Sequence, residues 1–199
     1  MAELLPALGR RFSCRQFNRE PVADDALDAV LEAGRIAPSA FGMEPWRFVV
    51  FRASASKNRL AEACYDQPPA VSAPVLVAIV ALHGALEPGS AFVEARLTAE
   101  AGGPPPEDMR EAWRGLHAQI RPRSWAIGQC YFAAAQMMVQ ATALGLGSCP
   151  MGGFDEAAVA TVLGLGSDEA PALVLALGHC AQAQGPRRRR GMGEILASG

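Results

Sequence analysis

Arginine residues gather near both ends of this sequence, in two patterns that could bind an anion. Arg11, Ser13 and Arg15 alternate in one short segment, and 187–190 is an uninterrupted arginine run. Alternate side chains of an extended segment share a face, so two guanidinium groups and a hydroxyl could hold a phosphate. By spacing alone, a solvated surface triplet is favoured for 11–15, and a solvated tail or a nucleic-acid patch remains open for the run. No aromatic residues are interleaved with the run, so stacking on bases is not indicated.

Two loops are further candidates for ligand contact. In the segment 147–154, GSCPMGGF, Gly152 and Gly153 precede a predicted helix, where backbone N–H groups can approach a ligand closely. An ordinary helix–helix turn is the alternative. The second loop lies within 37–51, APSAFGMEPWRFVVF, where Pro38 ends a predicted helix and Trp46 precedes an apolar strand. This loop either closes a core or lines a pocket.

Side chains that would carry out catalysis without a cofactor are not evident. The histidines at 83, 117 and 179 have no evident partners, and the last is interpreted as structural. There is no H-E-x-x-H, no P-loop and no complete dinucleotide-binding glycine motif. The five cysteines, at 14, 64, 130, 149 and 180, form no C-x-x-C pair. This pattern argues against a disulfide framework and against a metal site, and it favours a reducing cytoplasm.

Composition predicts a globular chain with no general affinity for polyanions. Half of the 199 residues are hydrophobic and the formal net charge is −2, so neither nucleic acid nor an anionic membrane is an expected partner. No secretory leader is evident. The apolar segment 125–144 is long enough to suggest a membrane span, but it contains three glutamines. It is interpreted as the central helix of a globular fold.

The elements that must position these candidates alternate irregularly along the chain. Helices are predicted at 2–11, 21–37, 54–64, 89–100, 107–120, 125–144 and 155–163, and strands at 47–51, 74–82 and 171–180. The string LGLGS at 144–148 and 163–167 is interpreted as two helix C-caps, and Pro68-Pro69 as a chain break. The polar stretch 83–123 is expected to project as a lid or an arm. Unequal helical blocks between the strands favour a helix-covered sheet of the α+β class, in one domain over 1–199.

Taken in order, four blocks resemble the nitroreductase family of FMN flavoproteins. They are Arg11-x-Ser13-x-Arg15-x-Phe17, the loop APSAFGMEPW at 37–46, the long helix and "CP…GF" turn within 125–153, and the arginine tail followed by Glu194-Ile195-Leu196. No block is decisive alone, but the ordered set spans nearly the whole chain. The resemblance implies a nitroreductase-like α+β fold, with a central, mainly antiparallel sheet surrounded by helices. It also implies an intertwined homodimer with FMN at the interface.

The resemblance implies a role for residues in each block. The phosphate and ribityl end of FMN would be held by Arg11, Ser13, Arg15, Arg188 and Arg190, with the register of the tail open by one residue. The isoalloxazine ring would lie along Pro150, Met151, Gly152 and Gly153, and would be contacted from the partner subunit by Pro38, Ser39 and Ala40. Asp66 or Gln67 would reach the pyrimidine edge. Phe41 and Gly42 would line the substrate pocket, with 83–123 at its mouth.

The implied activity is reduction of nitroaromatics, quinones or similar conjugated acceptors by NADH or NADPH in a ping-pong cycle. FMN would carry the chemistry at its N5 atom, which accounts for the absence of a protein nucleophile. Alternatives are a specialised family enzyme (an enone or aldehyde reductase, a dehalogenase or a flavin-consuming enzyme), a non-catalytic FMN-binding protein and an anion-binding module. The chain departs from many relatives at Gly42, Glu44, Gly128 and Gly152, where asparagine, glutamine, lysine and glutamate are common. These changes bear on substrate choice.

Overall fold

A four-stranded antiparallel sheet forms the centre of the computed structural model, which describes residues 3–197. Its strand order is β1-β2-β4-β3, and the strands are β1 (Trp46–Phe51), β2 (Val75–Ala81), β4 (Ala170–Gly178) and β3 (Gly147–Met151). Every residue of β2 and β4 is buried. The two continuous apolar runs are therefore buried strands, as the sequence predicts, and they lie at the centre of the sheet.

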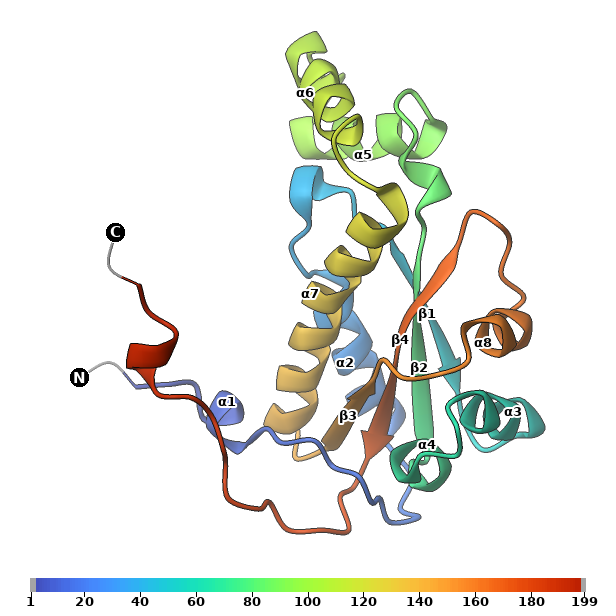
Figure 1. The fold of residues 1–199 in the computed structure, drawn as a ribbon, viewed down its shortest axis with the longest axis vertical. Helices are drawn as coiled ribbons and strands as arrows, with labels where there is room; N and C mark the ends of the chain where they lie inside the picture. The colour runs from blue at the N-terminus through green and yellow to red at the C-terminus, as the bar shows by residue number, and fades with distance from the viewer. Residues whose placement is uncertain (1–2, 198–199) are drawn as a thin grey trace.

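Helices cover both faces of the sheet, which makes the α+β prediction correct (Figure 1). Helices α2 (Asp24–Arg35) and α7 (Pro122–Ala143) pack on one face. Helices α3 (Ala55–Ala63), α4 (Pro68–Ser72) and α8 (Glu156–Leu163) pack on the other. Successive residues of a strand point to opposite faces. Accordingly, Val77 and Ile79 of β2 belong to the α2–α7 core, whereas Leu76 and Ala78 belong to the opposite core.

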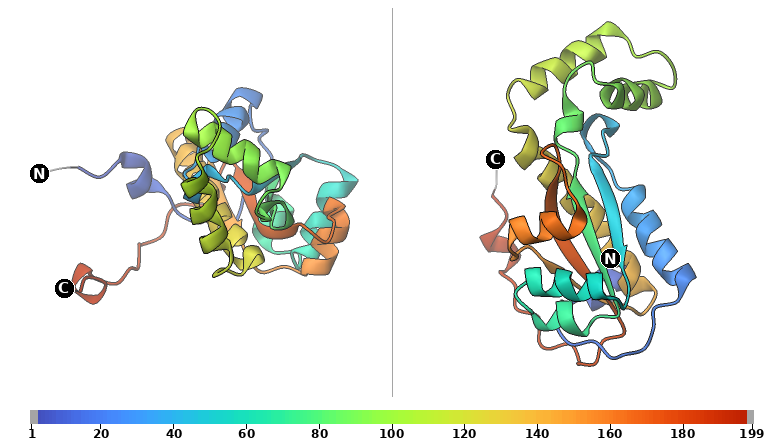
Figure 2. Two further views of the ribbon diagram at one scale, coloured as in Figure 1. Left: turned by 90° about the horizontal axis from the view of Figure 1, so that it is seen from above. Right: turned by 90° about the vertical axis from the view of Figure 1, so that its right-hand side faces the viewer.

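The segment 83–123, called the arm below, projects beyond one end of the sheet (Figures 1 and 2). It contains the short helix η2 (Gly84–Leu86), α5 (Ala91–Ala101) and α6 (Glu107–His117). Trp113 of α6 is its buried centre, and the indole N–H donates to the Leu86 carbonyl at 3.3 Å. The arm therefore has a small core of its own, and that core continues into the main one.

Both ends of the described chain extend away from the sheet on the side of α7 (Figures 1 and 2). Helix α1 (Pro6–Arg10) lies on the N-terminal arm, and the short helix η3 (Met192–Glu194) lies on the C-terminal tail. Large apolar side chains on these arms are exposed: Leu4, Leu5, Met192, Ile195 and Leu196. Within 3–197, no helix is both long and apolar enough to cross a membrane.

Three predictions about local structure are wrong. The segment 147–151 is an edge strand, not a turn, because pairing with β4 overrides the weak strand propensity of its glycine and proline. Pro68-Pro69 begins α4 instead of breaking the chain, because the first turn of a helix does not need the missing N–H groups. The first helix covers only Pro6–Arg10 of the predicted 2–11, and residue 2 lies outside the described range. Both glycine C-caps are confirmed, since Gly145 and Gly164 have φ of 80° and 63°.

Candidate functional site

A pocket of about 510 Å³ lies between the segment 11–15 and the C-terminal tail. Its polar lining residues are Arg11, Ser13, Arg15, Gln182, Gln184, Arg187, Arg188 and Arg189. The structure thus brings together the two arginine-rich ends of the chain, which the family resemblance implies at one phosphate. Of the two predicted tail residues, Arg188 lines the pocket and Arg190 does not. Arg187 and Arg189 line it as well, which agrees with a predicted register that was open by one residue.

An extended backbone positions the first half of this pocket. Ser13 forms a parallel bridge with Ser148 of β3, and the Cys14 N–H donates to the Ser148 carbonyl at 3.0 Å. The segment therefore runs along the free edge of β3, and alternate side chains share a face as expected. In the second half, Arg187 Nη2 donates to the carbonyl oxygens of Gly9 and Arg11 at 2.8 and 2.7 Å.

The pocket carries positive charge without a carboxylate among its described lining residues. Burial, followed by the positive charges of Arg187 and Arg189, lowers the pKa of Arg11. Guanidinium groups that repel one another in this way are stabilised by a bound anion. A phosphate monoester, with nearly two negative charges and several acceptor oxygens, fits this donor set.

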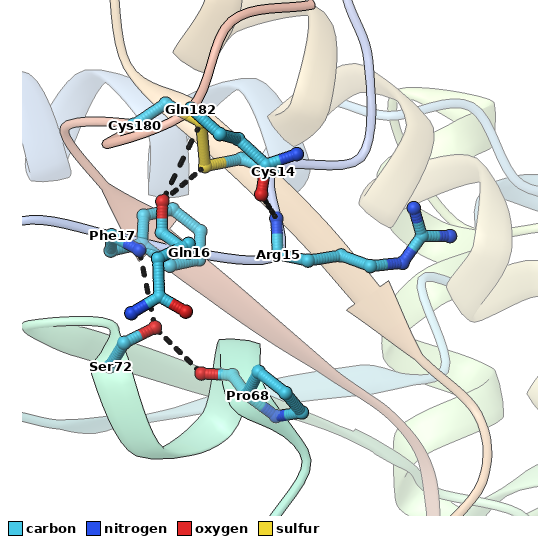
Figure 3. Close-up of a disulfide and its surroundings, with 8 residues drawn as sticks. All are labelled: Cys14, Arg15, Gln16, Phe17, Pro68, Ser72, Cys180 and Gln182. Carbon is cyan, nitrogen blue, oxygen red and sulfur yellow. Dashed lines mark hydrogen bonds between the residues drawn. A yellow bond between two sulfur atoms is a disulfide. The ribbon is translucent and has the colours of Figure 1, made fainter. Parts of the chain in front are cut away.

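A disulfide joins the two halves of the pocket, which corrects the expectation that the cysteines remain unpaired (Figure 3). Cys14 lies between Ser13 and Arg15, and Cys180 follows β4. The two are separated by 166 residues, so neither spacing nor the odd number of cysteines could reveal the pair. The isolated bridge between Phe17 and Cys180 brings the two segments together.

The opposite end of β3 presents the backbone of Gly152 and Gly153. Both glycines are exposed, and a Cβ at Gly153 would meet no atom within 4 Å. Gln67 lies beside them: its Nε2 donates to the carbonyl oxygens of Gly153 and Cys64 at 2.6 and 2.9 Å. Of the two candidates at 66 and 67, Gln67 therefore makes the contact with this segment. Pro150 and Met151 are the last residues of β3 and lead directly into the glycines.

The loop after α2 has a strained backbone that the arm holds in place. Phe41, Gly42 and Glu44 have φ of 57°, 59° and 43°, in the left-handed region that non-glycine residues avoid. Ser39 Oγ accepts the Glu44 N–H at 2.8 Å. Arg96 of α5 donates to the Gly42 carbonyl at 2.7 Å and to Glu44 Oε1 at 2.6 Å. No sequence pattern indicated Arg96, because 52 residues separate it from Glu44.

The arm also contacts the two residues predicted for the substrate pocket. The rings of Phe41 and Trp113 meet edge to face, with centroids 5.6 Å apart. A Cβ at Gly42 would lie 2.4 Å from Glu100 Oε2, so the Glu100 carboxylate occupies the space beside the missing side chain. Where many relatives are expected to have an asparagine side chain, this chain has Gly42 with the Glu100 carboxylate of α5 beside it.

Within one chain, the loop at 38–42 and the glycines at 152–153 lie on different sides of α7. The Ala40 N–H donates to Gln129 Oε1 at 3.0 Å. A Cβ at Gly152 would lie 3.4 Å from the Tyr131 hydroxyl. Residues two apart on a helix point roughly 200° apart, so Gln129 and Tyr131 face opposite ways. Within the described residues, no group of three or more His, Cys, Asp or Glu side chains could hold a metal ion.

Comparison with known proteins identifies the family of this chain. The sequence profile of the Nitroreductase family matches residues 8–179. An NADH dehydrogenase from Thermus thermophilus is 35% identical over 184 residues, which cover 92% of this chain and 89% of that protein. An oxygen-insensitive NADPH nitroreductase from Helicobacter acinonychis is 26% identical, over 92% of this chain and 90% of its own length.

Two solved structures have the same fold. A nitroreductase-like protein from Streptococcus mutans superposes with a TM-score of 0.84 at 22% identity, over 97% of this chain and 96% of its own. A protein from Exiguobacterium sibiricum, solved in complex with FMN, has a TM-score of 0.81 at 22% identity, over 100% and 98% of the two chains. With the profile match over most of its length, the chain belongs to the Nitroreductase family.

Proposed function

We propose that this protein binds FMN and uses NADH or NADPH to reduce nitroaromatics, quinones or similar conjugated acceptors. One observation carries the proposal: an arginine pocket lies beside the start of β3, and open glycine backbone follows its end. A five-residue strand spans roughly 15 Å, so a phosphate and a flat ring of one extended ligand could be bound along it. The relatives named for NADH and NADPH, and the FMN complex of the similar structure, support this choice.

Different residues are proposed to bind the phosphate and the ring of FMN. Arg11, Ser13 and Arg15 hold the phosphate with Arg188 and its neighbours, which replaces the hydration that the phosphate loses. Gly152 and Gly153 admit a ring close to the backbone, and Gln67 fixes the orientation of that backbone through the Gly153 carbonyl. FMN supplies the hydride chemistry when bound. The protein therefore needs no nucleophile of its own, and one pocket can serve the electron donor and the acceptor in turn, as a ping-pong cycle requires.

The complete site is proposed to need two copies of the chain. Pro38, Ser39 and Ala40 lie on the other side of α7 from the glycines, so both groups can contact one flavin only if they come from different subunits. Tyr131 and Phe132 of α7 are 49% and 52% exposed. Together with the apolar side chains of both arms, they form a surface suited to a homodimer. The arm at 83–123 would border the acceptor pocket through Phe41.

Ligand titrations test the cofactor proposal. We expect Arg15→Ala to weaken FMN binding by at least about tenfold and to leave riboflavin, which lacks the phosphate, unchanged. Arg59→Ala is the matched control, because Arg59 is exposed on α3 and, among the described residues, donates only to Ser56 Oγ at 3.4 Å. Anaerobic NADPH or NADH should bleach the bound flavin, and the faster donor is the physiological one. A purified protein that stays colourless and cannot be reconstituted with FMN would overturn the proposal.

Light scattering after size exclusion tests the dimer. We expect Phe132→Asp to shift the mass of the wild-type dimer to that of a monomer. Tyr65→Asp is the control, because Tyr65 is 65% exposed and follows α3, on the face of the sheet away from α7. A wild-type protein that is monomeric at micromolar concentration would exclude the two-subunit site.

A further inference from the structure

The disulfide fixes the base of the tail that completes the arginine pocket. Cys14 lies inside the N-terminal motif, and Cys180 lies two residues before Gln182, the first tail residue in the pocket lining. Two hydrogen bonds accompany it. The Ala181 N–H donates to the Gln16 carbonyl at 2.8 Å, and the Arg15 N–H donates to Gln182 Oε1 at 3.3 Å (Figure 3). Residues 181–197 are exposed throughout.

Electrostatic repulsion opposes the position of this tail. Burial, and then the charges of Arg187 and Arg189 across the pocket, lower the pKa of Arg11, so the tail arginines disfavour the charged form of Arg11. Beyond Gln182, the hydrogen bonds of Arg187 to Gly9 and Arg11 are the described side-chain contacts that return the tail to the N-terminal segment. A covalent link at the base of the tail keeps the like charges together before an anion arrives, which is preorganisation.

We propose that the Cys14–Cys180 pair is a thiol–disulfide switch that sets how tightly the arginine pocket holds a phosphate-bearing ligand. The disulfide form is the tight state, and the dithiol form releases the tail and weakens the pocket. The proposal rests on the proposed function to the extent that FMN is the ligand. The anion pocket and the disulfide are independent of that identity.

The exchange balances with a dithiol reductant. One thiolate of the reductant attacks Sγ of Cys180, which is partly exposed, whereas Cys14 is fully buried. The protein S–S bond breaks, and Cys14 leaves as a thiolate that takes up a proton. The second thiol of the reductant then attacks the mixed disulfide and releases Cys180 as a thiol. Two electrons and two protons have moved to the protein, and the reductant leaves as a disulfide.

A hydrogen-bond acceptor for the two thiols of the reduced form is already in place, and Cys149 does not react with the disulfide. Sγ of Cys14 and of Cys180 lie 3.2 and 3.7 Å from the Gln16 carbonyl oxygen, an acceptor for the S–H groups that reduction creates. Cys149 is the free cysteine whose thiol is close enough to sense Arg11 and Arg15, but burial raises its pKa nevertheless. At neutral pH it is a thiol and does not attack the disulfide.

Thiol counting and tail proteolysis test the switch without any flavin. Alkylation of the denatured, non-reduced protein should label three of the five cysteines, Cys64, Cys130 and Cys149. Five labelled cysteines would overturn the proposal. In the native apoprotein, trypsin should cut at 187–190 faster after reduction, and inorganic phosphate should protect only the oxidised form. Equal cleavage in both states, with and without phosphate, would also overturn it.

Ligand affinity completes the test. Reduction of the wild-type protein should weaken FMN binding by about tenfold and leave riboflavin binding unchanged. The double variant C14S/C180S should match the reduced wild type and should not respond to the reductant, which controls for effects of the reductant itself. Equal FMN affinity in the two redox states would contradict the switch. If neither flavin binds in either state, the proposed function fails, and the phosphate-dependent proteolysis still decides the switch.

Discussion

Gln67 uses both hydrogens of its amide on backbone carbonyls, and this limits what it can offer a ligand. With Nε2 committed to Gly153 and Cys64, the remaining polar atom is the acceptor oxygen. That oxygen can accept from a ring N–H, which is the contact that the resemblance implies for a pyrimidine edge. The same side chain also fixes the carbonyl of Gly153. Gln67 is thus proposed to bind the ring and to position the backbone beside it.

Replacement of Gln67 by glutamate keeps the size of the side chain and removes its ability to donate hydrogen bonds. A carboxylate cannot donate, so it would leave the two carbonyls unpaired and place a negative charge against them. We expect Gln67→Glu to weaken FMN binding by about tenfold or more, measured by fluorescence titration. Gln119→Glu is the matched control, because Gln119 donates to the Gly115 carbonyl at 3.0 Å on the exposed end of α6. Unchanged FMN affinity in the Gln67 variant would contradict the positioning role.

At the scale of elements, α5 holds the strained loop at 39–44, and hydrogen exchange can measure this. In Arg96→Leu, the bonds to Gly42 and Glu44 are lost, and the left-handed residues have less to hold them. We expect the amides of Gly42, Met43 and Glu44 to exchange at least about tenfold faster. The control is Arg110→Leu, which removes the pair between Arg110 and Glu94 inside the arm, at 2.9 Å. Equal exchange at 42–44 in both variants would show that the arm does not hold the loop.

Sequence patterns predicted most helices and strands, because the spacing of apolar residues reflects which face of each element is buried. They failed where pairing with a distant strand determines the local structure. The apolar runs of β2 and β4 and the glycine C-caps are local signals. Strand β3 is not a local signal, since GSCPM has weak strand propensity and is extended because β4 and Ser13 pair with it. The motifs of the site were visible as residue types. Contacts between distant segments, such as Gly42 with Arg96 and Glu100, were not.

One ion pair links two strands that are not neighbours, and it predicts an acid-dependent stability. Arg47 of β1 makes two hydrogen bonds, of 2.6 and 3.0 Å, to Glu169, which immediately precedes β4. The hydrogen bond from Arg47 lowers the pKa of Glu169 below its ordinary 4.5. Because the folded state holds the ionised form, this stabilisation is present above pH 4.5 and is lost as the pH falls through the lowered value.

Glu169→Gln should therefore unfold more easily than the wild type at pH 7, by about 1 kcal/mol given the partial exposure of the pair. The difference in the free energy of unfolding should remain constant down to pH 5 and should shrink below that. Urea unfolding at several pH values measures it. The control is Glu32→Gln, which removes an exposed pair within α2. A difference that grows as the pH falls would contradict the assigned pKa shift.

At the scale of the whole molecule, the described chain exposes apolar surface that the proposed second copy would cover. Helix α7 buries one face on the sheet and exposes aromatic side chains on the other. The two terminal segments, which carry further exposed apolar side chains, reach away from the body (Figure 2). An apolar helix was expected to be central, and α7 is central only if a second copy covers its outer face. The backbone of Gly152 and Gly153 and the loop at 38–42 would likewise form one site only if they came from two copies of the chain. The dimer and the cofactor site are thus one proposal at this scale.

The Cys14–Cys180 disulfide predicts a second property at this scale, the resistance of the chain to unfolding. A link between residues 166 positions apart restricts most of the unfolded chain, and in the chain-entropy model such a loop stabilises the folded state by up to about 5 kcal/mol. We expect reduction to lower the midpoint of urea unfolding, with the protein concentration held fixed because of the proposed dimer. The double variant C14S/C180S should unfold at the lower midpoint with or without reductant. If reduction leaves the wild-type midpoint unchanged while thiol counting shows that the bond was broken, the link constrains the tail alone.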